Sequence, residues 1–350
     1  MTLDGCPVAR TEARGGALLQ VEDLHVTFSA RARAFGGRRR IAPVRAVDGV
    51  DLEIGRGEIV ALAGESGCGK TTLARSLMGF VRPDGGRILY EGKPLARDLR
   101  SYRRQVQMVY QDPSGALNPR QSVYDSVAEG LRVHKVPGDE QALVAQALSR
   151  AGLRPPERFF LRFPHELSGG QRQRVVIAGA LVLEPRVIIA DEPVSNLDAS
   201  VRGEILRLLL ELRRTSGISI MIVTHDLGLA WTVADRVAVM YMGRIVEVGP
   251  TRDMLTEPHH PYTRALLDVV PDSGGLPASE RPLLAGEPPD PTQIPPGCRF
   301  HPRCPAVVLG VAATAGVQEA CHTLDPVLLG VDPVHLAACH LAQVKNGPVR

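Results

Sequence analysis

Two short glycine-rich stretches contain the residue types that bind phosphate groups. The first, GESGCGKTT from Gly64 to Thr72, fits the pattern G-x-x-x-x-G-K-[ST], in which backbone N–H groups converge on anionic oxygens. The second, LSGGQ from Leu167 to Gln171, puts Ser168 where a helix N-cap belongs, so a second anion site is expected there. Phosphate-binding loops occur in many unrelated proteins, so neither stretch alone decides the function.

The first stretch divides the work of holding a nucleoside triphosphate among its side chains. Lys70 is expected to reach the β- and γ-phosphates, and the Thr71 hydroxyl is expected to bind Mg²⁺. Cys68 occupies a variable position, where a thiol reagent could block the site sterically. The full set expected to bind ATP in this loop is Gly64, Ser66, Gly67, Cys68, Gly69, Lys70, Thr71 and Thr72.

Short apolar runs indicate an α/β fold around this loop. IVALAG precedes the loop and predicts a strand, a turn and then a helix, which is the arrangement of a P-loop (RecA-like) ATPase core. VIIADE and ISIMIVTHD are short enough to be buried parallel strands, and they end in Asp191, Glu192 and His225. Between the phosphate loop and VIIADE the pattern changes to amphipathic helices, so a helical subdomain of about residues 112–174 is expected to be inserted into the core.

The composition argues against several classes of protein. The chain has 350 residues, 44% of them hydrophobic, and a formal net charge of +3, which by itself gives no argument for nucleic acid. The start carries no signal-peptide pattern, and the longest suspect apolar run, Ala306 to Val317, is shorter than the ~18–20 residues that a membrane span needs. We therefore expect a cytoplasmic protein whose membrane partners, if any, supply the spans.

The C-terminal part differs in composition from the rest. It is rich in proline after Pro250 and contains four of the six cysteines, spaced C-x5-C-x16-C-x17-C. In a reducing compartment such clustering points to a metal more than to disulfides. The expected organisation is a flexible tail at 1–17, an ATPase domain at 18–250, a Pro-rich linker region at 251–296 and a Cys-containing module at 297–350.

Together the two glycine-rich motifs resemble the ATP-binding-cassette (ABC) family, over about residues 18–250. The resemblance implies that Asp191 coordinates Mg²⁺ together with Thr71 and Gln111. It implies that Glu192 polarises the attacking water, that Gln111 couples hydrolysis to the helical subdomain, and that His225 contacts the γ-phosphate. Hydrolysis of ATP then depends on positioning and charge stabilisation more than on covalent chemistry.

The same resemblance assigns the adenine base and a second subunit. Phe28, at the end of the first predicted strand, is expected to stack on the base, with Phe35 as the alternative. One chain has two anion-binding helix starts but only one set of the other ATP contacts. We therefore expect a head-to-tail pair of ATPase subunits in which the second stretch serves the ATP held by the partner, through Ser168, Gly169, Gly170 and Gln171.

Two further segments narrow the family. EPHHPYTRALL, from Glu257 to Leu267, and GCRFHPRCP, from Gly297 to Pro305, are similar to the C-terminal region of ATPase subunits in the oligopeptide, dipeptide and nickel importer group. This implies an ATPase at the cytoplasmic face of the membrane that powers an importer of di- or oligopeptides. Its expected partners are two transmembrane permease subunits, a second ABC ATPase subunit that is identical or related, and an extracytoplasmic substrate-binding protein.

The four C-terminal cysteines suit either an iron–sulfur cluster or tetrahedral zinc. Some relatives in the importer group carry a four-iron cluster here, so a [4Fe-4S] cluster is the favoured interpretation, with zinc and four ordinary cysteines as alternatives. The middle spacing is longer than the family usually shows. The cysteines are Cys298, Cys304, Cys321 and Cys339, with His301, His322, His335 and His340 nearby as further zinc ligands.

A different class of function remains as the rival interpretation. Some soluble ABC ATPases act on nucleic acid or ribosomes, and the arginines of residues 31–40 could contact phosphates. The chain, however, has a single cassette and no heptad-rich coiled coil, so direct binding to nucleic acid is not expected. A regulator without hydrolysis is disfavoured because Glu192 and His225 are both present.

One position in the second stretch's helix departs from the family. Gly179 stands where an arginine is usual. A glycine inside a helix costs about 1 kcal/mol relative to alanine. We expect ATPase activity to survive this change.

Overall fold

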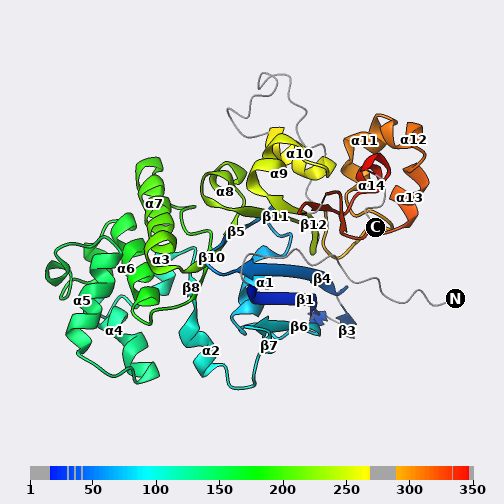
Figure 1. The fold of residues 1–350 in the computed structure, drawn as a ribbon. Helices are drawn as coiled ribbons and strands as arrows, with labels where there is room; N and C mark the ends of the chain where they lie inside the picture. Colours follow the sequence, from blue (N-terminus) through cyan, green and yellow to red (C-terminus); the bar gives the residue numbers. More distant parts are fainter. Residues whose placement is uncertain are drawn as a thin grey trace.

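The computed structural model describes residues 16–29, 31–34, 37–40, 42–268, 289–332 and 334–346 (Figure 1). Within these ranges no helix combines the length and the apolar character that crossing a membrane requires. The expected tail at 1–17 falls almost entirely outside them, as does Phe35. The arginine-rich segment forms a two-stranded hairpin, β2 (Arg31–Ala34) and β3 (Gly37–Arg40), whose side chains are outside the described part.

The main sheet has eight strands in the order β13-β14-β12-β11-β5-β10-β9-β8. The five adjacent strands from β11 to the edge strand β8 are parallel, and three of them, β5, β9 and β10, are buried along their whole length because the sheet is covered on both faces. The parallel strands are β8 (Val106–Val109), β9 (Val187–Asp191), β10 (Ser219–Thr224), β5 (Ile59–Ala63) and β11 (Arg236–Tyr241), and β12 (Arg244–Pro250) runs antiparallel beside β11.

A second, antiparallel sheet packs beside the P-loop helix α1 (Lys70–Leu77). Apolar side chains of both sheets and of α1, such as Leu24, Leu62 and Leu73, form one buried cluster. This mixed α/β architecture confirms the predicted P-loop ATPase core. The strands of the second sheet, in spatial order, are β4 (Val44–Gly55), β1 (Ala17–Phe28), β6 (Gly85–Tyr90) and β7 (Lys93–Pro94), and α2 (Arg100–Gln105) leads into β8.

The helical subdomain lies at one end of the molecule, opposite the C-terminal part (Figure 1). Its helices begin at side-chain caps, including Ser122 before α4 and Asp139 before α5. The predicted end at residue 174 is too early, because α6 runs on through the apolar sequence VVIAGAL and stops only before Glu184 and Pro185. The helices are α3 (Pro113–Ala116), α4 (Val123–His134), α5 (Glu140–Arg150) and α6 (Gly169–Leu181).

The helices after the subdomain correct the expected linker of residues 251–296. After α7 (Ala199–Ser216) and α8 (Leu227–Val233), the chain forms α9 (Thr251–Thr256) and α10 (Pro261–Asp268). These two helices bury Met254 and Tyr262 against the core, so the first part of that region is folded. The proline content that suggested a linker does not reveal these buried contacts.

The Cys-containing module is joined to the main sheet and is not simply appended to it. Its β14 pairs with β12, with Val248 opposite Leu336 and Glu247 opposite Ala337. The rest of the module is made of short elements, η3 (His301–Arg303), α11 (Pro305–Val308), α12 (Val311–Thr314), α13 (Gln318–Thr323), β13 (Leu329–Gly330), β14 (Leu336–Ala337) and α14 (His340–Asn346).

Candidate functional site

The P-loop, residues 64–72, connects β5 to α1 as the sequence predicts. Gly64 and Gly69 have φ angles of +150° and +112°, where glycine is favoured. A Cβ atom on Gly64 would lie 2.2 Å from the Met240 carbonyl oxygen, and one on Gly69 would lie 2.0 Å from the Ala46 carbonyl oxygen. The loop therefore owes its close fit against β4 and β11 to these two glycines, while Ser66 and Gly67 are exposed at its tip.

Lys70, which is expected to supply positive charge to the phosphate site, is buried inside the loop. Its Nζ donates to the carbonyl oxygens of Gly64 and Glu65, both at 2.8 Å, and lies 3.7 Å from the Cys68 sulfur. Cys68 is itself buried, and burial raises the pKa of its thiol. A neutral, covered thiol is a poor target for reagents, so the expectation that modification of Cys68 blocks the site does not fit the structure.

Thr71 and Asp191 provide two neighbouring oxygen atoms for a magnesium ion. The Thr71 hydroxyl donates to Asp191 Oδ1 at 3.2 Å. Magnesium binds oxygen ligands at about 2.0–2.1 Å in an octahedron, which puts adjacent ligand atoms about 3 Å apart, so this pair fits Mg²⁺. Burial raises the pKa of Asp191 and neighbouring Glu192 adds to this effect, against the hydrogen bond from Thr71. A bound cation would favour the ionised carboxylate.

Three predicted catalytic residues meet at Glu192. Gln111 Nε2 donates to Glu192 Oε2 at 2.9 Å, and His225 Nδ1 lies 3.0 Å from Glu192 Oε1. The three residues follow β8, β9 and β10 respectively, so they share the carboxyl edge of the parallel sheet. Glu192 has a φ of +46°, an unfavourable backbone conformation that its N–H stabilises by donating to the Val223 carbonyl at 2.9 Å.

The second glycine-rich stretch forms the start of α6. Ser168 is the N-cap, its Oγ accepts from the Gln171 N–H at 3.2 Å, and the Gln171 side chain accepts from the Ser168 N–H at 3.0 Å. A Cβ atom on Gly170 would lie 2.5 Å from Val201 of α7, so close helix packing explains that glycine. Ser168 is exposed, and within the described ranges no hydrogen bond links this segment to the P-loop.

Phe28 is the residue predicted to stack on the adenine base. It ends β1 with 48% of its surface exposed and pairs with Val44 of β4. Two residues further along β4, the Ala46 carbonyl contacts the Gly69 position of the P-loop. An exposed ring on a strand next to β4 suits stacking, and this role of Phe28 stays a prediction.

Sequence reasoning missed the residues that hold Glu65, the second residue of the P-loop. The Glu65 N–H donates to the Tyr262 hydroxyl at 2.9 Å. Arg303 of the Cys-containing module forms two bonds to the Glu65 carboxylate, at 2.8 and 3.0 Å. The C-terminal region thus contacts the ATP site directly. The sequence does contain a signal for this contact, because the segments around Tyr262 and Arg303 are both features of one importer group.

The four C-terminal cysteines line one cavity of about 20 Å³, together with residues of α10 and α14. Among the described residues, no three of their sulfur atoms lie within 4.8 Å of one another. Tetrahedral zinc with Zn–S bonds of about 2.3 Å would need separations of about 3.8 Å. Burial raises the pKa of Cys298 to about 12 and that of Cys339 to about 11, so both are neutral thiols at pH 7.

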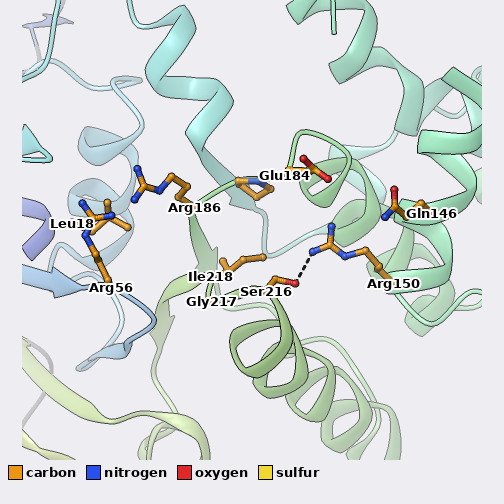
Figure 2. A pocket seen from close by; sticks show the side chains of 10 residues that line it. Leu18, Arg56, Gln146, Arg150, Glu184, Arg186, Ser216, Gly217 and Ile218 are labelled. Atoms are coloured by element: carbon orange, nitrogen blue, oxygen red, sulfur yellow. Dashed lines mark hydrogen bonds between the residues drawn. The ribbon is translucent and has the colours of Figure 1, made fainter. Parts of the chain in front are cut away.

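A larger cavity of about 570 Å³ lies between the helical subdomain and the core (Figure 2). Arg56, Arg150 and Arg186 line it, with Arg150 donating to the Ser216 hydroxyl at 2.9 Å. Arg56 and Arg186 both pair with Glu91, so their charges are already compensated. No P-loop residue lines this cavity, which separates it from the candidate ATP site.

Comparison with known proteins agrees with this geometry. The family model for the ABC transporter matches residues 47–195, and that for the oligopeptide/dipeptide transporter C-terminal region matches residues 246–309. A putative peptide import ATP-binding protein of Brucella abortus is 39% identical over 89% of this chain and 96% of its own length. The oligopeptide transport ATP-binding protein AppF of Bacillus subtilis is 37% identical over 95% of this chain and 99% of its own.

Solved structures give the same fold. CbiO1 from Clostridium perfringens, part of the ABC transporter complex cbiONQ, is 35% identical with a TM-score of 0.59, covering 69% of this chain and 91% of that one. The ATP-binding cassette MJ0796, a dimer bound to ADP and Pi, is 27% identical with a TM-score of 0.57, covering 67% of this chain and 99% of that one. The range matched by the ABC transporter family model, 47–195, includes the P-loop, the ends of β8 and β9 and the start of α6.

Proposed function

The chain belongs to the ABC transporter family, as an ATP-hydrolysing ATP-binding subunit, and on this premise we propose that it powers the import of di- or oligopeptides. The observation that carries the catalytic part is the network in which Gln111 and His225 both bond to Glu192, beside the Thr71–Asp191 pair. The observation that carries the peptide part is the match of residues 246–309 to the oligopeptide/dipeptide transporter C-terminal region.

The proposed mechanism assigns one task to each of these residues. Lys70 leaves the loop carbonyls and pairs with the β- and γ-phosphates. Thr71, Asp191 and Gln111 would hold Mg²⁺, which neutralises charge on the phosphate oxygens. Glu192 orients the attacking water and accepts its proton, and His225 contacts the γ-phosphate while staying within reach of Glu192.

We also assign the second glycine-rich stretch to the partner subunit's ATP. Ser168 is exposed at a helix start, where backbone N–H groups favour an anion. The related cassette MJ0796 is dimeric. Two subunits packed head to tail would close on ATP and open after hydrolysis, which gives the stroke that drives transport.

The remaining partners follow from the importer assignment. Two transmembrane permease subunits would supply the membrane spans, and an extracytoplasmic binding protein would deliver the peptide. The chain then works at the cytoplasmic face of the membrane. The choice among peptides rests with those partners, so it is not encoded in this chain.

Affinity capture tests the importer assignment. A tagged Glu192→Gln protein is captured from native membranes with ATP, because loss of hydrolysis should keep the closed complex together. Two polytopic membrane proteins and an ATPase subunit are expected in the eluate, and uptake of labelled peptide should be lost in cells that carry only this variant. Ribosomes or nucleic acid in their place would support the rival class of soluble ABC ATPase.

For the C-terminal cysteines we propose a [4Fe-4S] cluster in preference to zinc. Four thiols converge on one cavity, and their separation exceeds what one tetrahedral zinc ion needs, whereas a cluster spreads its thiolates over four iron atoms. The cavity walls around Cys298 and Cys339 must move outward to admit it. Iron and sulfide analysis of anaerobically purified protein tests this, with a Cys298→Ser variant as the control; zinc alone, or no metal, contradicts it.

A further inference from the structure

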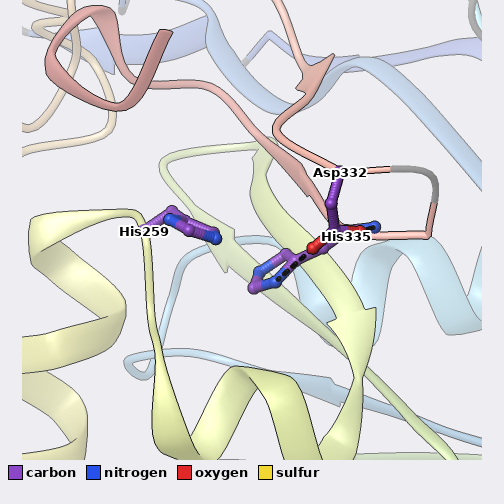
Figure 3. Close-up of side chains that lie close together, drawn as sticks. All are labelled: His259, Asp332 and His335. Atoms are coloured by element: carbon purple, nitrogen blue, oxygen red, sulfur yellow. Dashed lines mark hydrogen bonds and ion pairs between the residues drawn. The ribbon is translucent and has the colours of Figure 1, made fainter. Parts of the chain in front are cut away.

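A second group of metal-ligating side chains lies outside both of these sites. The side chains of His259, Asp332 and His335 each offer a ligand atom, and these atoms all lie within 4.8 Å of one another. Figure 3 shows His259 approaching from one side and Asp332 from the other, with the His335 ring between them. His259 lies between α9 and α10, while Asp332 and His335 lie between β13 and β14, so the group joins the ATPase core to the module.

A buried carboxylate holds the central ring of this group in place. Glu247 of β12 is fully buried, and its Oε1 lies 2.8 Å from Nε2 of His335, which is 1% exposed. Glu247 also accepts from the backbone N–H groups of His259 and His260, at 2.6 and 3.1 Å. With Nε2 bound to Glu247, the Nδ1 atom of His335 lies on the Asp332 side, 4.0 Å from its Oδ2. A carboxylate behind a histidine is the usual support of a metal-bound imidazole.

The other two ligands are also available to bind a metal. Asp332 Oδ1 accepts from the N–H groups of Val334 and His335, at 2.9 and 2.8 Å, which orients the carboxylate and leaves Oδ2 toward His335. The rings of His259 and His335 have centroids 4.6 Å apart. No hydrogen bond of the described residues engages the His259 ring.

We propose that His259, Asp332 and His335 bind one Zn²⁺ ion, with Glu247 as the positioning residue. Two imidazole nitrogens and one carboxylate oxygen suit zinc, whereas Mg²⁺ and Ca²⁺ prefer oxygen ligands throughout. Zinc bonds of about 2.0–2.2 Å place ligand atoms about 3.4 Å apart, so side-chain rotations of His259 and Asp332 must close the present gaps. Water completes the fourth position.

The bound ion would tie the module to the core. Apart from Phe300 and Cys304, which pack in a core cluster, the module's own clusters around Ala342 and Ala312 are small. Small units of this kind depend on added links for their stability. A zinc ion on His259 and the two module residues would add such a link beside the β12–β14 pairing, independently of the four cysteines.

The test uses Zn²⁺ and Co²⁺ as probes on the full-length protein. Zinc affinity is measured by competition with a chromophoric chelator in the wild type, His259→Gln and the matched control His322→Gln. The His322 ring lies beside that of His301 with the same 4.6 Å centroid separation, but no third ligand adjoins that pair in the described part of the chain. We expect the Kd of one zinc ion to rise at least tenfold in His259→Gln and to stay unchanged in the control.

Cobalt separates this site from the cysteines. Cobalt on thiolates gives an intense charge-transfer band in the near ultraviolet, whereas cobalt on nitrogen and oxygen gives only weak visible bands. The weak bands should be present in the wild type and absent in both His259→Gln and Asp332→Asn, while the metal-free variants keep wild-type ATPase activity as proof of folding. Equal zinc affinity in the wild type and His259→Gln, or a cobalt spectrum that is wholly thiolate, would overturn the proposal.

Discussion

The ATP site and the Cys-containing module differ in what holds their functional groups in place. In the ATP site the side chains already bond to one another, as Gln111 and His225 do to Glu192. In the module the four cysteines surround a cavity, and three sulfur atoms nowhere come together within the described residues. The functional side chains of the first site are held by bonds to one another, whereas the four thiols of the second share a cavity without such contacts.

The secondary structure around each site explains this difference. The catalytic residues follow neighbouring parallel strands, whose spacing and register are set by backbone hydrogen bonds. The cysteines lie in or beside short helices, and their apolar contacts are divided among three separate clusters. The module is joined to the core by the β12–β14 pairing, by Phe300 in a core cluster and by ion pairs, of which Arg299 to Asp48 and Arg303 to Glu65 are buried or nearly so. The parallel sheet therefore fixes the positions of the catalytic residues, and the module is positioned by its contacts with the core.

The largest expected effect is on the ATP site, where Glu192→Gln should reduce kcat about 10²–10³-fold with little change in KM for ATP. The amide keeps the shape and the bond to Gln111 but cannot accept a proton from water. Steady-state ATPase assays measure this. Glu184→Gln is the matched control, since Glu184 also has a positive φ, of +51°, and lies in the cavity of Figure 2. Normal hydrolysis by Glu192→Gln would show that the preformed network is not the catalytic assembly.

The second prediction concerns acid stability at the junction with the module. His260 is buried, and burial lowers its pKa from 6.5 to about 4 despite nearby Glu247. Below pH 6.5 the unfolded chain binds a proton at His260 that the folded chain does not bind. The contribution of His260 to stability is therefore fully present above pH 6.5 and is lost as the pH falls from 6.5 to 4. We expect a loss of about 2 kcal/mol by pH 5 from this residue.

The single tryptophan, Trp231, offers a probe for this prediction, because it packs on the same apolar cluster as Tyr262 and Phe300. Urea unfolding is followed by its fluorescence at pH 7 and pH 5. His260→Gln should unfold more easily at both pH values but show a smaller difference between them. An equal pH dependence in the variant would mean that the junction is no more acid-sensitive than the ATP site.

The same contrast decides how far the sequence could predict the structure. The P-loop, Asp191, Glu192 and His225 were predictable because each follows a short apolar run, and strand ends in a parallel sheet converge. The contact of Arg303 with Glu65 was not, because the two residues are far apart in sequence and no periodicity relates them. The folded state of residues 251–268 was hidden for a similar reason: Met254 and Tyr262 pack on the core through tertiary contacts. The start of α6 was predictable from its cap, but its end was not.

A third prediction tests whether the module supports the ATP site. Arg303→Gln removes the partner of the Glu65 carboxylate and should raise KM for ATP about tenfold, or ~1.4 kcal/mol, with a smaller change in kcat. Arg244→Gln is the control, since Arg244 joins core and module through Asp325, at 3.1 Å, without touching the P-loop. Adding Glu65→Gln to Arg303→Gln should recover part of the loss, because neither partner is then left unpaired. Equal KM values in the two single variants would make the module a passive attachment.

The smallest effect is expected inside α6, where the helix as a whole, and not each of its residues, positions the second glycine-rich stretch. Gly179 is in the helix interior, and the nearest atom to an added Cβ, the Ser126 carbonyl oxygen, is 3.9 Å away. Gly179→Ala should therefore raise the free energy of unfolding by about 0.5–1 kcal/mol without changing ATPase activity. Gly217→Ala is the matched control, because that site is equally open but has a φ of +64° at the end of α7, so alanine should lower stability there. Urea titrations of both variants measure these changes. A loss of activity in Gly179→Ala at unchanged stability would show that the departure from arginine is a functional adjustment and that the ATP site depends on more than its strand ends.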